Sequence, residues 1–495
     1  MFFRRFFRAA GVNVFVTLLV LGAGVQSPAW AKETRPTFAA LPATQQTMLN
    51  DLEQRTFRWF WDSADPKTGL IPDHYPGESF SSIAAVGFGL TAYGVGVERG
   101  YIKRAQAVDR TLVTLRFFKN APQNDSEDDD TGYHGFFYHF LNMKTGRRED
   151  RQVELSSVDT TLLLGGVLFA QSYYDRDTPK EKEIRQLADD IYRNVDWTWM
   201  QARPPLISMG WTPGGKFIPA DWKGYCEGML VYVLALGSPT HPVSADAWKA
   251  WTSTNDLTWG TFQGQTFLGF APMFGHQYSQ TWIDFRGIRD DWNRQHDLDY
   301  FENSRRATIS QRNYAIENPG KWTGYGPNVW GLTASNGPGN FKLKGANGER
   351  EFEGYSARGA GLDYIRDDGT LAPTAAGGSI AFAPEIVVPA LAEMKQRYGK
   401  YIYNQYGFVD AFNPSFHIQT RHGTGKLVPE LGWVDDEELG IDQGPIVLMI
   451  ENWRSDFVWK VMKKNPYIRK GLERAGFTGG WLDQSTTAGK AAGTP

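Results

Sequence analysis

The sequence has a single cysteine, Cys226, among 495 residues, so no disulfide can form within the chain. Its stability must come from a hydrophobic core, which a chain of this length can bury. The formal net charge is −3 and no Lys/Arg stripe occurs, so we expect no nucleic-acid partner. Motifs for metal, nucleotide or serine-hydrolase chemistry are also missing, so we predict no cofactor and no metal.

The first 31 residues have the features of a secretory signal peptide. Arg4, Arg5 and Arg8 precede a short apolar run at 14–24, and Ala29-Trp30-Ala31 is a cleavage motif. We expect cleavage after Ala31 and a periplasmic or secreted protein without a membrane anchor. An uncleaved anchor is the alternative, although the run is shorter than the roughly 20 apolar residues that a membrane helix needs.

The remaining chain shows two kinds of helical pattern. Charged residues follow one face of the amphipathic segments, which are 45–63, 103–118, 178–200, 297–318 and 456–474. Apolar, Gly/Ala-rich segments without a polar face are 82–98, 158–171, 226–236, 274–287, 326–335 and 442–453. Buried helices alternating with half-exposed ones predict an all-α protein with two concentric rings, an (α/α)6 toroid.

The other segments suggest insertions in this toroid. Residues 132–153, 205–222 and 257–272 carry turn-punctuated strand patterns, which we interpret as β-hairpins around a cleft. A separate β domain is the rival interpretation, and length alone would allow two or three domains. Residues 336–380 predict a long functional loop. We expect one domain at 40–480, and a disordered Ser/Thr/Gly/Ala-rich tail at 481–495.

Three acidic residues open apolar segments, and they are the strongest indication of chemistry. Asp159, Glu227 and Asp442 stand at or near the N-terminal ends of predicted buried helices. If these helices run parallel, their carboxylates meet at one rim. Desolvation there would raise the pKa of Glu227, as a general acid requires. A plain helix-capping role is the alternative for each residue. Glu154, near Asp159, could join it as a general base.

Aromatic residues make up 14% of the chain and many lie in Gly/Pro-rich, loop-like contexts. Aromatic faces stack on sugars, and Trp N–H and Tyr O–H groups bind hydroxyls. The alternative is that they fill gaps between loops. Paired acids with aromatics predict a glycoside hydrolase, in which inversion needs roughly 6.5–9.5 Å between the two carboxyl groups. A polysaccharide lyase, another toroid enzyme and a non-catalytic periplasmic glycan-binding protein are the alternatives.

Several segments resemble the glucoamylase-like family, which includes bacterial β-1,2-glucanases of glycoside hydrolase family 144. They are Gly237–Pro242, Phe274–Ser279, Trp282–Arg286, Tyr300–Ala307, Trp330–Ser335, Asp368–Ala376, Tyr406–Phe408, Asp410–Asn413 and Gly440–Ile446. The resemblance spans roughly residues 50–475. It implies an (α/α)6 barrel, a periplasmic or secreted setting and hydrolysis of β-1,2-glucan by inversion. It also indicates Glu227 as the acid, with Cys226 where the family motif has Asn.

We therefore predict that Glu227 protonates the leaving oxygen of a β-glucan, within the chain rather than at its end. Asp159 or Asp442, with Glu154 as a possible helper, would activate water directly or through a substrate hydroxyl. We expect a monomer. The side chains expected to bind substrate are Trp211, Tyr225, His276, Trp282, Arg286, Trp330, Asn336, Trp433 and Gln443.

Overall fold

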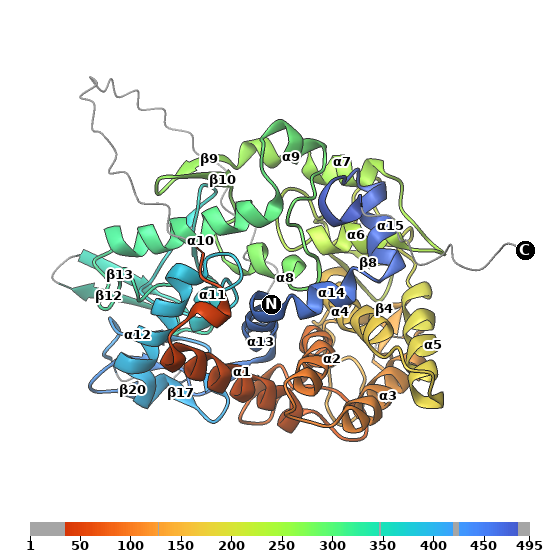
Figure 1. The fold of residues 1–495 in the computed structure, drawn as a ribbon, viewed down its shortest axis with the longest axis horizontal. Coiled ribbons are helices and arrows are strands. Elements are labelled where there is room, and N and C mark those ends of the chain that lie inside the picture. Colours follow the sequence, from red (N-terminus) through yellow and green to blue (C-terminus); the bar gives the residue numbers. More distant parts are fainter. Residues whose placement is uncertain (1–34, 127, 346–347, 419–424, 484–495) are drawn as a thin grey trace, which may run out of the picture.

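The computed structural model describes residues 35–126, 128–345, 348–418 and 425–483. The predicted signal peptide and most of the predicted tail lie outside these residues. The described part is helix-rich, with short strands between the helices (Figure 1). None of its helices combines the length and the apolar character needed to cross a bilayer.

One set of helices is buried on nearly every side. It comprises α2 (Ile83–Glu98), α4 (Ser157–Tyr173), α6 (Met229–Gly237), α8 (Phe274–Trp282), α11 (Pro373–Gly377) and α13 (Gly440–Ser455). In this set α2 packs against α4 and α13, α6 against α4 and α8, and α13 against α8 and α11. A helix without a polar face can be stable only in such an interior. The prediction of two helix types is therefore confirmed.

A second set packs outside the first and carries the charged residues. Its members are α1 (Ala43–Ser63), α3 (Arg104–Asn120), α5 (Pro179–Arg193), α10 (Tyr300–Glu317), α12 (Pro384–Ile402) and α15 (Pro466–Arg474). Each of these helices contacts a buried one; α3, for example, packs on α2, and α5 on α4. In Figure 1 the amphipathic helices α1, α3, α5 and α12 lie toward the periphery, while α13 lies near the centre.

Close approach of α2 and α4 depends on glycine. A Cβ atom on Gly87 would lie 2.1 Å from the carbonyl oxygen of Leu162, and one on Gly166 would lie 2.1 Å from that of Gly87. Both distances are far below van der Waals contact. The two buried helices therefore touch backbone to backbone, which explains the abundance of small residues in their sequences.

Some helix predictions are wrong in extent or in kind. Residues 326–335 form an irregular segment that ends in the short strand β11 (Ala334–Ser335), because Gly326, Pro327 and Gly331 interrupt any helical repeat. The 456–474 pattern splits into α14 (Phe457–Met462) and α15. Segment 274–287 ends as a helix at Trp282, since Ile283 is extended. Helix α12 was not predicted at all.

The expected hairpins are present and join in part into one sheet. Strands β3 (Gly132–Tyr133) and β4 (Phe136–Tyr138), with the hairpin of β7 (Gly210–Thr212) and β8 (Lys216–Phe217), flank β6 (Leu155–Ser156) in the order β3-β4-β6-β7-β8. Strands β9 (Trp259–Phe262) and β10 (Gln265–Leu268) form a separate hairpin. Because β6 continues directly into α4, this sheet fixes the start of that helix.

Residues 336–380 are more ordered than their sequence pattern indicates. They contain β12 (Phe341–Gly345), β13 (Gly348–Phe352), β14 (Ser356–Ala357), β15 (Gly359–Ala360), β16 (Ile365–Arg366) and α11. The other short elements are β1 (His74–Tyr75), β2 (Ser81–Ser82), β5 (Phe140–Leu141), α7 (Asp246–Thr252), α9 (Asp291–Gln295), β17 (Tyr403–Asn404), β18 (Gly407–Phe408), β19 (Phe412–Asn413), β20 (Lys426–Val428), β21 (Gly432–Val434) and β22 (Glu438–Leu439).

Candidate active site

Asp159, Glu227 and Asp442 all stand where a buried helix begins. Asp159 lies in the first turn of α4, whose N-cap is Ser156, and Asp442 lies in the first turn of α13 directly after strand β22. Glu227 lies in the turn that precedes α6. Asp159 and Asp442 are buried, each with 4% of its surface exposed. Helix N-termini favour such carboxylates because their free N–H groups and dipole are positive.

Helix packing brings the three carboxyl groups toward one region, because α4, α6 and α13 all contact α8, which carries Tyr278. Burial raises the pKa of the Tyr278 hydroxyl well above its usual range, and the charges of Asp442, Glu227 and Asp159 raise it further. One hydroxyl therefore lies within electrostatic reach of all three acids. The three acids come from separate segments of the chain, and more than 200 positions lie between Glu227 and Asp442.

Glu227 has the environment of a proton donor. Burial raises the pKa of its carboxyl group to about 7, and the charge of Asp159 contributes in the same direction. Its Oε2 atom is buried, and no donor among the described residues reaches it. Ionisation there is costly because the charge would lose water, and the backbone hydrogen bond of Glu227 offsets only part of this loss. The carboxyl group is therefore suited to hold a proton near neutral pH.

Asp159 and Glu154 are joined by His139, a residue that the sequence analysis did not select. His139 Nδ1 lies 2.9 Å from Glu154 Oε1, and its Nε2 lies 3.4 Å from Asp159 Oδ1. Ser156 donates to Asp159 Oδ2 at 2.5 Å. Although burial lowers the pKa of His139, Asp159 and Glu154 outweigh it and raise that pKa to about 9. An imidazolium thus stands between two acids near neutral pH.

Asp442 forms a second carboxyl pair, with Asp410, which the sequence analysis also missed. The two groups are hydrogen-bonded, which requires one of them to carry a proton. Burial raises the pKa of Asp442 to about 7, whereas the hydrogen bond from Asp410 lowers it. The backbone N–H of Asn336 donates to Asp410 Oδ2 at 2.7 Å, and its side chain donates to Asp435 at 2.9 Å. Asn336 is thus the predicted binding residue that contacts these acids.

Other predicted binding residues have protein partners instead. The Tyr225 hydroxyl donates to His276 Nδ1 at 3.0 Å, and His276 Nε2 donates to the Phe270 carbonyl, so neither nitrogen of that histidine is left for a sugar. The fully buried Trp282 donates to Thr91 at 3.0 Å. Arg286 pairs with Asp284 and Asp456, beyond the C-terminal end of α8. Tyr225, His276, Trp282 and Arg286 therefore hold parts of the fold together, and their polar groups are occupied by protein partners.

The four remaining predicted binding residues are also buried. Trp211 has 2% of its surface exposed and stacks on Tyr133, and Trp330 has none exposed. Trp433 is 3% exposed in a small aromatic cluster. Gln443 donates to the Phe408 carbonyl at 2.9 Å. For these tryptophans the alternative of gap-filling between loops describes the packing that is seen.

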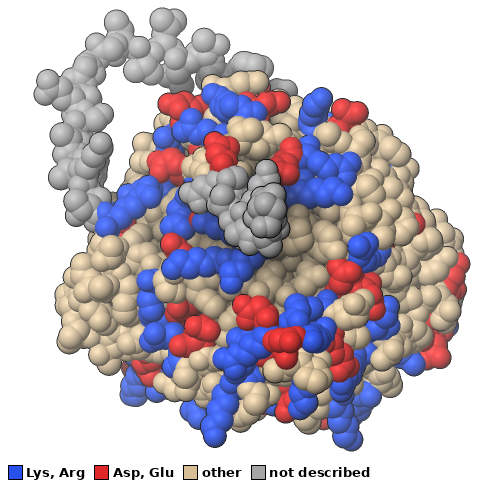
Figure 2. Space-filling model, turned by 45° about the vertical axis from the view of Figure 1, so that its right-hand side comes forward, with Lys and Arg blue, Asp and Glu red and all other residues tan. Residues whose placement is uncertain are grey.

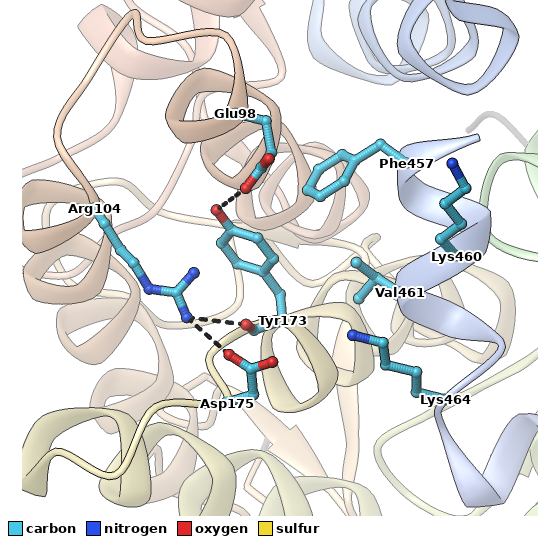
Figure 3. A pocket seen from close by; sticks show the side chains of 8 residues that line it. All are labelled: Glu98, Arg104, Tyr173, Asp175, Phe457, Lys460, Val461 and Lys464. Carbon is cyan, nitrogen blue, oxygen red and sulfur yellow. Dashed lines mark hydrogen bonds and ion pairs between the residues drawn. The ribbon is translucent and has the colours of Figure 1, made fainter. Parts of the chain in front are cut away.

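A pocket of about 270 Å³ lies elsewhere, beside the C-terminal ends of α2 and α4 (Figure 3). Its lining residues are Glu98, Arg104, Tyr173, Asp175, Phe457, Lys460, Val461 and Lys464. Asp159 lies at the opposite end of α4, so this pocket is separate from the acids. On the face seen in Figure 2, positive and negative side chains are interspersed.

A family comparison identifies the relatives of this chain. The family model Glycoamylase, described as "Putative glucoamylase", matches residues 219–466, which is half of the chain. The chain belongs to this family. The resemblance stated in the sequence analysis is thereby confirmed, and the matched region includes Glu227, Asp410 and Asp442.

Relatives of known name are similar over most of the chain. An exo β-1,2-glucooligosaccharide sophorohydrolase from Parabacteroides distasonis is 29% identical over 467 residues; this chain spans 58% of that enzyme's length. An endo-β-1,2-glucanase from Chitinophaga pinensis, solved with sophorotriose and glucose, is 28% identical with a TM-score of 0.75, over 90% of this chain and 100% of that one. A "putative glucoamylase" from Bacteroides uniformis is 30% identical with a TM-score of 0.74, over 90% and 100%.

Proposed function

We propose that this protein hydrolyses β-1,2-glucan, with Glu227 as general acid. The observation that carries the proposal is the packing of α4, α6 and α13 against α8, which brings Asp159, Glu227 and Asp442 toward the Tyr278 hydroxyl. Glycoside hydrolysis needs two carboxyl groups, one that gives a proton and one that accepts a proton. The names of the relatives from Parabacteroides distasonis and Chitinophaga pinensis support this choice of glucan.

In the proposed mechanism Glu227 gives its proton to the glycosidic oxygen as the bond to the anomeric carbon breaks. Water attacks that carbon from the opposite face, and Asp442 accepts the water proton, directly or through a substrate hydroxyl. We assign the base to Asp442 because the hydrogen bond from Asp410 favours its ionised form, whereas Asp159 is engaged by Ser156 and by the His139 cation. Asp159, together with Glu154 and His139, then positions and polarises the substrate. The sugar is released with inverted configuration.

We also propose that residues 40–480 form one domain with the architecture of an (α/α)6 toroid. Six buried helices that contact one another, each with an amphipathic helix outside it, support this architecture. Cleavage within the glucan chain is supported by the Chitinophaga pinensis endo-enzyme, which this chain covers completely. We further propose a monomer that is secreted or periplasmic after removal of residues 1–31.

The test is incubation with β-1,2-, β-1,3- and β-1,4-glucans, followed by chromatography of the products. We expect oligosaccharides only from the β-1,2-glucan, and loss of at least about a hundredfold in rate for Glu227→Gln. Glu53→Gln is the matched control, because Glu53 is also a buried glutamate with a pKa raised to about 7 by burial, but it pairs with Arg454 in the last turn of α13, whereas Asp442 lies in the first turn. No product from any glucan, or full activity of Glu227→Gln, would refute the proposal.

A further inference from the structure

Two tyrosines on one loop stand out because few large hydrophobic side chains are exposed among the residues that the structure describes. Tyr355 and Tyr364 lie in the segment Glu353–Arg366, which includes β14 and β15 and ends in β16. They expose 43% and 38% of their surfaces, respectively. An exposed aromatic ring costs free energy in water and is therefore a candidate contact surface.

Backbone contacts connect this loop to the acids. Strand β14 pairs with β11, so Ser356, the neighbour of Tyr355, lies opposite Ser335. The next residue, Asn336, donates its backbone N–H to Asp410. Loss of hydration raises the pKa of the Tyr355 hydroxyl, and Asp442, Asp73, Asp410 and Asp159 raise it further. Tyr355 therefore lies on the Asp442 side of the site.

Tyr364 lies on the other side. Its neighbour Asp363 accepts a hydrogen bond at 3.2 Å from the backbone of Ala271, shortly before α8, and its own hydroxyl donates to Ala357 at 3.2 Å. Burial raises the pKa of Tyr364, with contributions from Asp363 and then from Glu227. Helix α8 also contacts Glu227 directly, because the Ser279 hydroxyl on α8 donates to the Glu227 carbonyl at 3.1 Å. Tyr364 therefore lies on the side of the proton donor.

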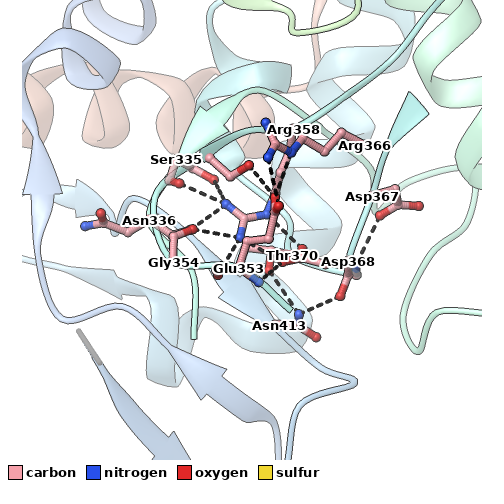
Figure 4. Close-up of polar contacts among 12 residues, drawn as sticks. Ser335, Asn336, Glu353, Gly354, Arg358, Arg366, Asp367, Asp368, Thr370 and Asn413 are labelled. Carbon is pink, nitrogen blue, oxygen red and sulfur yellow. Dashed lines mark hydrogen bonds and ion pairs between the residues drawn. The ribbon is translucent and has the colours of Figure 1, made fainter. Parts of the chain in front are cut away.

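A buried arginine holds the loop in this position (Figure 4). Arg358 has 1% of its surface exposed and forms an ion pair with Asp368 at 2.8 Å. Its guanidinium also donates to four backbone carbonyls, which are those of Ser335, Asn336, Glu353 and Gly354. All these contacts fix the segments on both sides of Tyr355. A platform that is ordered before binding loses little entropy when substrate arrives.

We propose that Tyr355 and Tyr364 are two sugar-stacking platforms that flank the scissile bond, with Arg358 as the positioning residue for their loop. Tyr364, beside the acid, holds the sugar that leaves, and Tyr355, beside the proposed base, holds the sugar that is attacked. A neutral glucan offers no charge, so its apolar C–H faces must supply much of the binding energy, and aromatic rings match them. This assignment rests on the proposed function.

The test is steady-state kinetics on β-1,2-glucan oligosaccharides for Tyr355→Ala, Tyr364→Ala and the two corresponding Phe variants. Each Ala variant should raise KM about tenfold, the equivalent of about 1.4 kcal/mol. Each Phe variant keeps the ring and should stay within about twofold of the wild type. Tyr401→Ala, on the outer helix α12, is the control and should leave KM unchanged. Arg358→Lys should raise KM as well; if it does not fold, the tyrosine variants decide alone.

Two failures can be told apart. Ala variants with wild-type KM, or Phe variants as impaired as Ala variants, would overturn the platform assignment while the wild type still cleaves β-1,2-glucan. A wild-type protein that neither binds nor cleaves this glucan would instead overturn the proposed function. Isothermal titration of oligosaccharide into the Glu227→Gln background separates binding from turnover, and there the Ala variants should bind about tenfold more weakly.

Discussion

Glu227→Gln should make the protein more stable at alkaline pH while abolishing its activity. The pKa of Glu227 is raised from 4.5 to about 7, first by burial and then by Asp159. Above pH 7 the folded protein must hold a buried charge that the unfolded chain exposes to water. The raised pKa lowers the free energy of unfolding by about 3 kcal/mol at pH 8, where the folded state carries the charge, and by about 1 kcal/mol at pH 5, where only the unfolded state is largely ionised. Gln carries no charge at either pH.

Whether stability rises or falls with pH depends on which state, folded or unfolded, binds the proton of Glu227 more tightly. The folded state has the higher pKa, so the free energy of unfolding falls as pH rises from about 4.5 through about 7. Glu227→Gln removes this fall. Relative to the wild type, the variant should therefore gain about 2 kcal/mol more at pH 8 than at pH 5, whatever the pH-independent effect of the substitution.

Equilibrium denaturation in urea at both pH values measures this difference. Glu349→Gln changes an exposed glutamate on β13 and should show the same ΔΔG at pH 5 and pH 8 within about 0.5 kcal/mol. If Glu227→Gln also shows no pH-dependent gain, its carboxyl group is not desolvated, and the reasoning that makes it the acid fails.

Three further predictions concern Asp410, His139 and the α2–α4 contact. Asp410→Ala should move the acidic limb of the kcat/KM pH profile up by roughly one unit, because it removes a hydrogen bond that lowers the pKa of Asp442; Asp410→Asn keeps a donor and should not move it. The raised pKa of His139 stabilises the folded state below about pH 6.5, and this stabilisation is lost as the pH rises through about 9. His139→Gln should therefore lose about 3 kcal/mol more stability at pH 6 than at pH 9.5. Gly166→Ala should destabilise by at least about 2 kcal/mol, whereas Gly399→Ala, which has room on α12, should be neutral or stabilising, both by thermal denaturation.

The helices and the three acids could be predicted because both depend on local patterns. A helix without a polar face has to be buried, and this feature identified α2, α4, α6 and α13 with small errors at their ends. Acidic residues at the start of such helices were then the natural candidates. Helix α12 escaped prediction even though its apolar residues Ile386, Val387, Ala390, Leu391 and Met394 follow a helical repeat.

The partners of the acids could not be predicted, since they depend on contacts between distant segments. Asp410 reaches Asp442 only because the strands around it pair across the chain, and His139 reaches Asp159 only through the five-stranded sheet. Conversely, His276 and Trp282 have the residue types of sugar ligands, yet core partners occupy them. Residue type indicates what a side chain can bind but not what fills the space beside it.

The central claim, that Glu227 and Asp442 act as acid and base across the scissile bond, is tested most directly by proton NMR of the reaction. The first sugar anomer released from a β-1,2-glucooligosaccharide should be α, with the β signal growing only later by mutarotation. Release of the β anomer first would show retention of configuration, and would contradict the assignment of Asp442 as a base that activates water.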